Sequence, residues 1–177
     1  MKKYFLIIPS ILFFSIIIVF FYLLFIERDP SELPSALINE KAPIFKAVSL
    51  LDNETFISTN ELGHEVTIVN FFASWCGPCR AEHYYINLLS KEKKLKVIGI
   101  NFKDDSQKAI KWLEELGNPY SIIAVDSDGS IGMNWGVYGL PETFIVNADN
   151  IIRYRHAGPI TKKMYNDFYL QVLEIKK

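Results

Sequence analysis

The chain has only two cysteines, and they stand two residues apart in the segment Trp75-Cys76-Gly77-Pro78-Cys79. Residues 66–73 before them form a continuous apolar run rich in β-branched and aromatic side chains, which predicts a buried strand. Pro78 suits the first turn of a helix, and apolar residues recur with helical spacing after it. The sequence therefore predicts a fold in which a buried strand leads directly into a helix, with the cysteine pair at the start of that helix. This position of a cysteine pair is typical of dithiol redox chemistry.

The first turn of a helix presents unpaired backbone N–H groups and a partial positive charge, which together stabilise a thiolate. The thiolate is the nucleophile of disulfide exchange, so we predict that Cys76 is the exposed attacking thiol. Cys79 lies one turn further into the helix and is the predicted resolving thiol.

Two other uses of the cysteines fit the sequence less well. A structural disulfide across so short a loop removes little entropy from the unfolded chain. A zinc site needs four ligands, and His64, His83 and His156 lack the paired spacing of a zinc motif. We therefore predict no metal, and no cofactor beyond the redox-active disulfide Cys76–Cys79.

Residues 4–26 contain no charged side chain and are long enough for a membrane helix, which needs about 20 apolar residues. A cleaved signal peptide has a shorter apolar core of about 7–15 residues, followed by small residues at the cleavage site. Here the run ends in Glu27-Arg28-Asp29-Pro30. We predict an uncleaved signal-anchor in a lipid bilayer, with a cleaved signal as the alternative.

Lys2 and Lys3 precede the span, and the positive-inside rule then places residues 1–3 in the cytoplasm and the rest of the chain outside. The polar, proline-marked residues 27–43 are the predicted tether, and residues 44–177 are the predicted domain. With the two lysines set aside, the 20 Asp and Glu outnumber the remaining Lys and Arg. This balance argues against a nucleic-acid partner, which would favour a basic stripe.

The rest of the chain alternates strand and helix signals. Apolar runs predict strands at 45–50, 55–57, 66–73, 96–101, 121–125, 143–146 and 151–155, and helical spacing predicts helices that begin at Pro78 and span 104–116 and 161–175. Strands joined through helices form parallel pairs, whereas the turn residues 147–150 indicate an antiparallel hairpin. The predicted fold class is therefore α/β, with a mixed central sheet flanked by helices.

This order of elements, with Trp-Cys-Gly-Pro-Cys after a strand, resembles the thioredoxin fold. Four further segments resemble the DsbE/CcmG family, namely residues 101–105, 112–120, 136–144 (Gly-Val-Tyr-Gly-Leu-Pro-Glu-Thr-Phe) and 151–158. That family consists of membrane-anchored thiol–disulfide oxidoreductases of bacterial cytochrome c maturation. The resemblance covers nearly the whole chain, including the anchor.

The resemblance implies a periplasmic reductant at the bacterial inner membrane. Its expected partners are apocytochrome c, whose haem-binding thiols it would keep reduced, or a haem-ligation relay protein. A membrane reductase of the DsbD or CcdA type would supply the electrons. Between its cysteines the chain has Gly-Pro, as thioredoxin does, where familiar members often have residues such as Pro-Thr. This difference bears on the redox potential.

The resemblance also implies a substrate-docking surface. Pro141 falls where the thioredoxin fold has a cis-proline beside the active site, and the Leu140 peptide would offer backbone hydrogen bonds to an extended substrate. Trp75 is predicted to cover the site and present a docking surface, with a core aromatic as the alternative. Tyr138 either lines the substrate groove or packs against Pro141.

Two carboxylates are candidates for proton transfer. Thioredoxin has a buried aspartate in the strand before its cysteines, and Asn70, which cannot exchange a proton, stands there in this chain. Glu82 lies three residues after Cys79 on the same helix face, and Glu142 follows the proposed cis-proline. Either carboxylate would take up the proton of Cys79, and the alternative for Glu82 is a solvated surface glutamate. His83 is predicted to be a surface histidine.

Two other functions remain open at this point. A general periplasmic disulfide oxidase or isomerase would use the same cysteines. The Cys-Gly-Pro-Cys motif argues against a strong oxidant, because thioredoxin lies near about −270 mV and strong oxidants near about −120 mV. The other alternative is a non-catalytic adaptor that binds apocytochrome c, in which case Cys76 would be dispensable.

Overall fold

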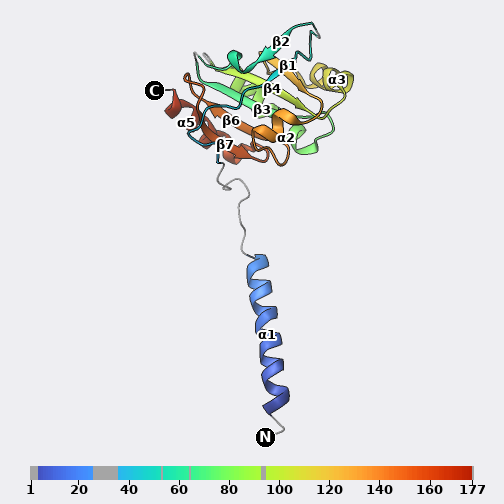
Figure 1. Cartoon of the computed structure of the whole chain (residues 1–177), viewed down its shortest axis with the longest axis vertical. Helices are drawn as coiled ribbons and strands as arrows, with labels where there is room; N and C mark the ends of the chain where they lie inside the picture. The colour runs from blue at the N-terminus through green and yellow to red at the C-terminus, as the bar shows by residue number, and fades with distance from the viewer. Residues whose placement is uncertain (1–3, 26–35, 53, 64, 93–94, 177) are drawn as a thin grey trace. The chain divides into compact units, whose positions relative to one another are not determined.

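The computed structural model describes residues 4–25, 36–52, 54–63, 65–92 and 95–176. The chain divides into two compact units after Pro30. The first unit holds helix α1 (Tyr4–Phe25), drawn in blue in Figure 1. Its stretch Ile8–Phe25 has a mean hydropathy of 2.6 and is long and apolar enough to cross a membrane. This helix fits the predicted anchor, while residues 1–3 and 26 lie outside the described residues.

The second unit is built on a five-stranded sheet with the strand order β5-β4-β3-β6-β7 (Figure 1). Its strands are β3 (Thr67–Phe72), β4 (Lys96–Phe102), β5 (Ile122–Asp126), β6 (Glu142–Val146) and β7 (Ile152–Ala157). Strand β4 pairs in parallel with β3 and β5, whereas β6 runs antiparallel to β3 and β7. The predicted mixed sheet is confirmed, with β3 buried along its whole length at the centre.

One face of the sheet is covered by the helices α2 (Gly77–Ser90), α3 (Ser106–Leu116) and α5 (Lys162–Ile175). Their apolar side chains form one core cluster with β3, which includes Ile68, Phe72, Ile86, Trp112 and Phe168. Strands β3, β4 and β5 follow one another across the sheet, and right-handed crossovers then place α2 and α3 on the same face. The start of α2 therefore lies at the end of the central strand β3.

The opposite face is covered by the hairpin of β1 (Lys46–Val48) and β2 (Phe56–Ser58), the 3₁₀ turn η2 (Thr59–Glu61) and the short helix α4 (Ser130–Asn134). Here Val69 and Phe71 of β3 pack in a second core cluster with Trp135 and Phe144. Alternate residues of β3 thus face the two clusters, as the pleat of a strand requires.

Helix α4 is absent from the sequence-based predictions. Its five residues are too few to produce a helical repeat of apolar positions. The carboxylate of Asp126 accepts hydrogen bonds from the N–H groups of Ile131 (3.1 Å) and Gly132 (2.8 Å). A side chain outside the helix therefore satisfies its first free N–H groups.

The predicted tether, residues 27–43, is too long at its C-terminal end. The backbone N–H groups of Asn39 and Ala42 donate to carbonyls in and just before β7, both at 2.8 Å, and Ala42 is buried. Leu37 packs against the second core cluster. The chain from Leu37 onward is therefore part of the domain, because its backbone pairs with the sheet edge despite its polar composition. Residues 27–35 of the predicted tether lie outside the described residues.

Candidate active site

Cys76 is the N-cap residue of α2, and a disulfide joins it to Cys79 with an Sγ–Sγ distance of 2.07 Å. The backbone N–H of Cys79 donates to Sγ of Cys76 at 3.1 Å. Only residues 73–75 separate the end of β3 from Cys76, so the buried central strand positions the start of the helix. On reduction, this N–H group and the positive end of the helix dipole lie at the sulfur that would carry the charge.

Cys76 is less accessible than the sequence suggested. Cys76 is 5% exposed in this oxidised state and Cys79 is 1% exposed, so the prediction of an exposed Cys76 is wrong for this state. Both residues belong to the core cluster beneath α2. The adjacent Trp75 is 61% exposed, which rules out the alternative of a core aromatic. Cys76 is the more exposed residue of the pair, and its attacking role stays a prediction.

The loop between β3 and α2 is held by the residues that follow β4. Asp104 accepts hydrogen bonds from the N–H of Ser74 at 2.5 Å and from its hydroxyl at 2.7 Å. The indole N–H of Trp75 donates to the carbonyl of Lys103 at 3.0 Å. Since β3 and β4 are parallel and in register, the two loops leave the same edge of the sheet. Sequence reasoning assigned Asp104 only to a helix start, because spacing along the chain carries no signal for this contact.

A surface groove of about 560 Å³ adjoins Trp75 through Lys103. Its lining residues are Phe102, Lys103, Asp128, Gly129, Ser130, Met133, Gly136, Val137 and Tyr138. Tyr138 is 59% exposed there, and the guanidinium of Arg155 lies 4.8 Å from the centre of its ring. Tyr138 therefore occupies one of the two positions that the sequence allowed, in the lining of the groove.

The peptide bond between Leu140 and Pro141 is cis, as predicted. In the register of β6 with β3, Glu142 lies opposite Phe71, which places Pro141 at the edge where β3 ends and the cysteine loop begins. The carbonyl of Pro141 accepts the N–H of Gly158 at 2.9 Å, and Leu140 packs against both core clusters. A backbone hydrogen bond on the Pro141 side and apolar packing on the Leu140 side thus hold the cis peptide, which is the proposed docking site.

Glu82 is 1% exposed, so the alternative of a solvated glutamate is wrong. Its Oε1 accepts a hydrogen bond from Nδ2 of Asn70 at 2.8 Å, and its Oε2 accepts one from the N–H of Ile160 at 2.9 Å. Burial raises the pKa of Glu82 to about 7, and the two N–H donors oppose this rise. A carboxyl group that titrates near neutral pH, one helical turn from Cys79, is suited to exchanging a proton there.

Glu82 should make the folded protein less stable as the pH rises. Between the ordinary pKa of 4.5 and the folded pKa of about 7, the folded state holds a proton that the unfolded chain has released. The free energy of unfolding therefore falls through this window, by about 3 kcal/mol for the full difference in pKa. Urea unfolding of the oxidised protein at pH values from roughly 4 to 8 checks this loss.

The variant Glu82→Gln should lack that part of the pH dependence, whatever its absolute stability. Glu114→Gln, which changes an exposed glutamate on α3, serves as the control and should follow the wild type. His83 is present in all of these proteins, so its contribution to the pH dependence of stability cancels when their curves are compared. Parallel pH curves for the wild type and Glu82→Gln would contradict a buried, protonated Glu82.

Glu142 is also 1% exposed, but a cation faces it. Its Oε2 accepts from Nε of Arg155 at 2.8 Å, and its Oε1 accepts from the N–H groups of Tyr138 (3.0 Å) and Gly139 (3.4 Å). Arg155 also donates from Nη2 to the carbonyl of Gly136 at 3.1 Å. The ion pair therefore holds the 136–139 loop that leads to the cis-proline. Sequence reasoning missed Arg155, whose partner lies on the neighbouring strand.

The prediction that His83 lies on the surface is wrong. The residue is 3% exposed, its Nε2 forms a hydrogen bond of 2.8 Å with the carbonyl of Gly117, and its ring centre lies 4.3 Å from that of Trp112. Burial lowers the pKa of His83, so the neutral ring is favoured. His83 thus joins α2 to the end of α3 within the core.

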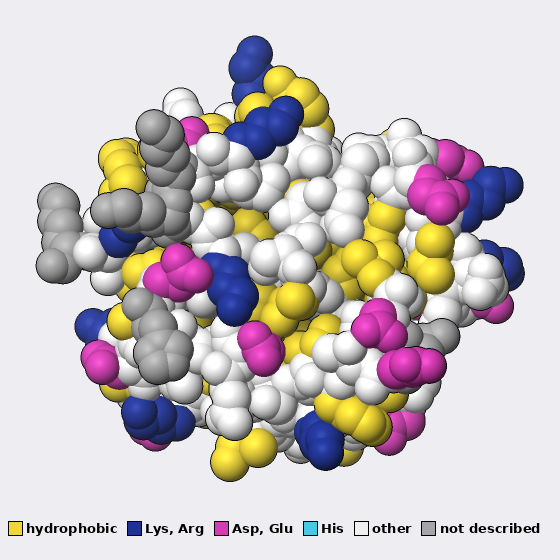
Figure 2. All heavy atoms as spheres, turned by 90° about the horizontal axis from the view of Figure 1, so that it is seen from above, with side chains coloured by type: hydrophobic (Ala, Val, Ile, Leu, Met, Phe, Trp, Pro, Cys, Tyr) yellow, Lys and Arg dark blue, Asp and Glu magenta, His cyan; other side chains and the backbone are white. Residues whose placement is uncertain are grey.

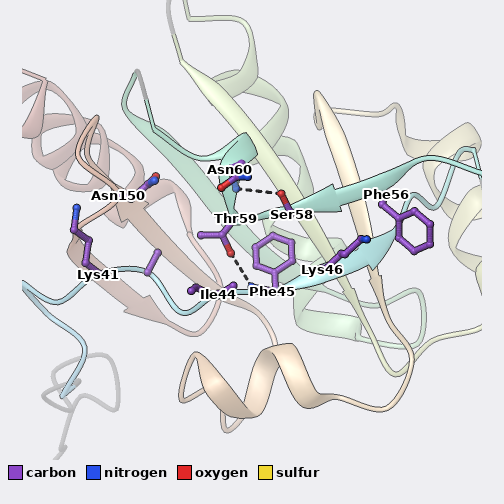
Figure 3. A pocket seen from close by; sticks show the side chains of 10 residues that line it. Lys41, Ile44, Phe45, Lys46, Phe56, Ser58, Thr59, Asn60 and Asn150 are labelled. Atoms are coloured by element: carbon purple, nitrogen blue, oxygen red, sulfur yellow. Dashed lines mark hydrogen bonds between the residues drawn. The ribbon is translucent and has the colours of Figure 1, made fainter.

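Another pocket, of about 640 Å³, lies between the β1–β2 hairpin and the loop at Asn150 (Figure 3). Hydrogen bonds from the N–H of Phe45 to Oγ1 of Thr59 (2.7 Å) and from the N–H of Asn60 to Oγ of Ser58 (3.3 Å) hold its wall. Its lining residues are Lys41, Ala42, Ile44, Phe45, Lys46, Phe56, Ser58, Thr59, Asn60 and Asn150. Among the described residues, this lining offers no thiol, imidazole or carboxyl group for redox or acid–base chemistry.

The face of the molecule in Figure 2 carries Lys and Arg interspersed with Asp and Glu, with apolar side chains between them. The charges on this face are not sorted into a basic stripe of the kind that binds nucleic acid. Within the described part of the chain, no three His, Cys, Asp or Glu side chains gather as a metal site would require. The absence of a metal and of a nucleic-acid partner stays a prediction.

Together, the mixed sheet, the disulfide at the start of α2 and the cis-proline at the adjoining sheet edge define a thioredoxin-like thiol–disulfide oxidoreductase. Residues 37–171 match the Redoxin family. The thiol:disulfide interchange protein DsbE of Escherichia coli (strain K12) is 43% identical over 171 residues, which cover 94% of this chain and 92% of that protein. DsbE of Haemophilus influenzae is 44% identical over 172 residues, or 93% and 92% of the two chains. The chain belongs to the DsbE family of thiol:disulfide interchange proteins.

Solved structures agree on the fold. A DsbE candidate from Chlorobium tepidum superposes with a TM-score of 0.71 at 24% identity, covering 81% of this chain and 100% of that one. A secreted Mycobacterium tuberculosis disulfide oxidoreductase homologous to E. coli DsbE gives a TM-score of 0.64 at 18% identity, with 73% and 95% covered. At these identities, the likeness concerns the fold alone.

Proposed function

We propose that this protein is a periplasmic reductant of protein disulfides in bacterial cytochrome c maturation. The observation that carries the proposal is the similarity to DsbE, 43% identity over 94% of the chain, together with the dithiol at the start of α2. Its substrate is the disulfide of the haem-binding cysteines of apocytochrome c, or a disulfide of a haem-ligation relay protein. The apolar N-terminal helix anchors it in the inner membrane with the domain in the periplasm, and a membrane reductase of the DsbD or CcdA type supplies its electrons.

The reaction starts from the reduced dithiol. The thiolate of Cys76 attacks one sulfur of the substrate disulfide, so the substrate S–S bond breaks and a bond between Cys76 and the substrate forms. The departing sulfur leaves as a thiolate, which takes a proton from solvent. The N–H of Cys79 and the dipole of α2 stabilise the attacking thiolate.

Cys79 then resolves the mixed disulfide. Its thiol transfers a proton to Glu82, and the resulting thiolate attacks Sγ of Cys76. The Cys76–Cys79 disulfide forms, and the second substrate sulfur leaves as a thiolate. The substrate gains two electrons, which the membrane reductase later returns to the protein. Glu82 suits this role because its pKa of about 7 allows it to take up and release a proton near neutral pH.

The substrate docks on the surface around the disulfide. The exposed ring of Trp75, the groove-lining Tyr138 and the cis peptide of Leu140 and Pro141 border the loop that carries the cysteines. Glu142 contributes to this surface by holding the 136–139 loop through its ion pair and backbone contacts. An extended substrate segment would pair its backbone with the Leu140 peptide.

The variant Cys79→Ser tests the cytochrome assignment by trapping. Without the resolving thiol, the reaction stops at the mixed disulfide, so full-length protein in its native membrane should carry a covalently linked partner. We expect mass spectrometry to identify apocytochrome c or a haem-ligation protein linked through Cys76. The double variant Cys76→Ser/Cys79→Ser is the control and should capture nothing. Capture of other periplasmic proteins alone would refute the cytochrome role and leave disulfide exchange intact.

A further inference from the structure

Three hydrogen bonds meet at the side-chain amide of Asn70, in the middle of β3. Its Nδ2 donates to Oε1 of Glu82 at 2.8 Å and to Oγ1 of Thr143 at 3.0 Å. The hydroxyl of Tyr120 donates to Oδ1 of Asn70 at 2.7 Å. Asn70, Glu82 and Thr143 are at most 1% exposed and Tyr120 is 6% exposed. Because these side chains lie in the core, water does not replace a lost partner.

The partners decide which way the Asn70 amide points. Ionised Glu82 can only accept hydrogen bonds, so it requires the NH₂ group of Asn70. The hydroxyl of Tyr120 can donate or accept; with the NH₂ group of Asn70 bound to Glu82 and Thr143, the amide oxygen is left for it, and it donates there at 2.7 Å. In the reversed orientation, the amide oxygen would face Oε1 of Glu82, and only a protonated Glu82 could donate to it. The orientation of Asn70 is therefore coupled to the protonation of Glu82.

We propose that Tyr120 is a positioning residue for disulfide exchange: its hydroxyl holds the Asn70 amide with the NH₂ group towards Glu82, and so sets how readily Glu82 takes up the proton of Cys79. This inference rests on the proposed role of Glu82 in resolving the mixed disulfide. It extends the site to a residue 50 positions from Asn70 in the sequence.

The ring of Tyr120 is held independently of its hydroxyl. It stacks on Phe72 with the ring centres 4.7 Å apart, and the N–H of Tyr120 donates to Oδ1 of Asn118 at 3.0 Å. Gly99, opposite Asn70 in the register of β3 and β4, leaves room for both rings. A Cβ at Gly99 would lie 3.0 Å from Tyr120 and 2.9 Å from Phe72. Tyr120→Phe should therefore keep the packing and remove only the hydrogen bond.

Other titratable groups occupy the elements around Glu82. Burial raises the pKa of Tyr120 well above its ordinary value, so its hydroxyl keeps its proton and acts as a donor. On α2, the two cysteines precede Glu82 and His83 follows it. On β7, His156 lies opposite Thr143 of β6. The cysteines, His83 and His156 are the same in the wild type and in Tyr120→Phe, so a comparison of the two proteins isolates the Tyr120 hydroxyl.

The test measures the pKa of Glu82 in the full-length, oxidised protein in lipid nanodiscs, by NMR of isotope-labelled glutamate carboxyl carbons assigned with Glu82→Gln. Tyr120→Phe should raise this pKa by about one pH unit, because it weakens a hydrogen bond to the charged form. The pH at which the mixed disulfide resolves at half its maximal rate should rise by the same amount. Tyr85→Phe, which removes a hydroxyl outside this network, should change neither value.

The variant Asn70→Ala shows whether the effect passes through the amide. In the Asn70→Ala background, Tyr120→Phe should produce no further change in the pKa of Glu82. An unchanged pKa in the single variant, or an equal change in both backgrounds, would overturn the proposal. If Glu82→Gln leaves the pH dependence of the rate of mixed-disulfide resolution unaltered, the proposed role of Glu82 fails. The pKa measurement then still decides whether Tyr120 acts on Glu82.

Discussion

Cys76→Ser should lower the rate of disulfide reduction by about a thousandfold or more, to the rate seen without the protein. Serine keeps the N-cap position but cannot form a mixed disulfide. The thiol of Cys79 is 1% exposed and lies one turn inside the helix, so it does not replace the attacking group. Reduction of a small disulfide substrate by the reduced full-length protein measures the loss.

Cys79→Ser is the matched control, because it also removes one thiol of the pair. It should keep the first attack and accumulate the mixed disulfide instead of losing reactivity altogether. In cells, Cys76→Ser should also abolish cytochrome c maturation if the proposed function holds. Maturation retained in that variant would favour a non-catalytic adaptor and contradict the proposed mechanism.

Arg155→Met should lower the free energy of unfolding by about 3–5 kcal/mol, because it leaves the carboxylate of Glu142 buried without its cation. The side chains of Arg155 and Glu142 are 7% and 1% exposed, so solvent cannot replace the 2.8 Å ion pair. The 136–139 loop should loosen as well, since both side chains bind its backbone. Chemical unfolding at neutral pH measures the loss, and a raised KM for a disulfide substrate would report the loosened loop.

Arg153→Met is the control for this prediction, because Arg153 is exposed on the same strand. Its effect on stability should stay within about 0.5 kcal/mol. Adding Glu142→Gln to Arg155→Met should restore part of the lost stability, since no uncompensated charge then remains in the core. Equal stabilities for Arg153→Met and Arg155→Met would refute the importance of the buried ion pair.

Much of the fold was predictable because its elements carry local signals. The apolar run 66–73 contains β3, and α3 begins after the N-cap Asp105 and ends at Gly117, whose φ is 87°. The errors have physical causes. Helix α4 depends on hydrogen bonds from its N–H groups to Asp126 instead of on an apolar repeat, and residues 37–43 join the domain by pairing with β7.

The site was predictable in its chemistry but not in its burial. The spacing of the cysteines and the position of the cis-proline follow from short motifs. Glu82 and His83 belong to residue types that usually face solvent, and this tendency predicted a surface position for His83 and supplied the solvated alternative for Glu82. Both are buried because α2 packs between β3, the loop at Ile160 and the end of α3. Of these neighbours, only β3 is adjacent to α2 in the sequence.

By itself, the sequence determined which chemistry this protein carries and on which elements: an apolar N-terminal helix, a buried strand, and a dithiol at the start of a helix. These features depend on spacing over a few residues. Only the tertiary structure decided what surrounds the titratable carboxyl group of Glu82. The hydrogen bonds of this site join Tyr120 to Asn70 and Ile160 to Glu82, which are 50 and 78 positions apart in the sequence. Such contacts form when distant segments fold together, and the low dielectric of the core strengthens their effect on Glu82.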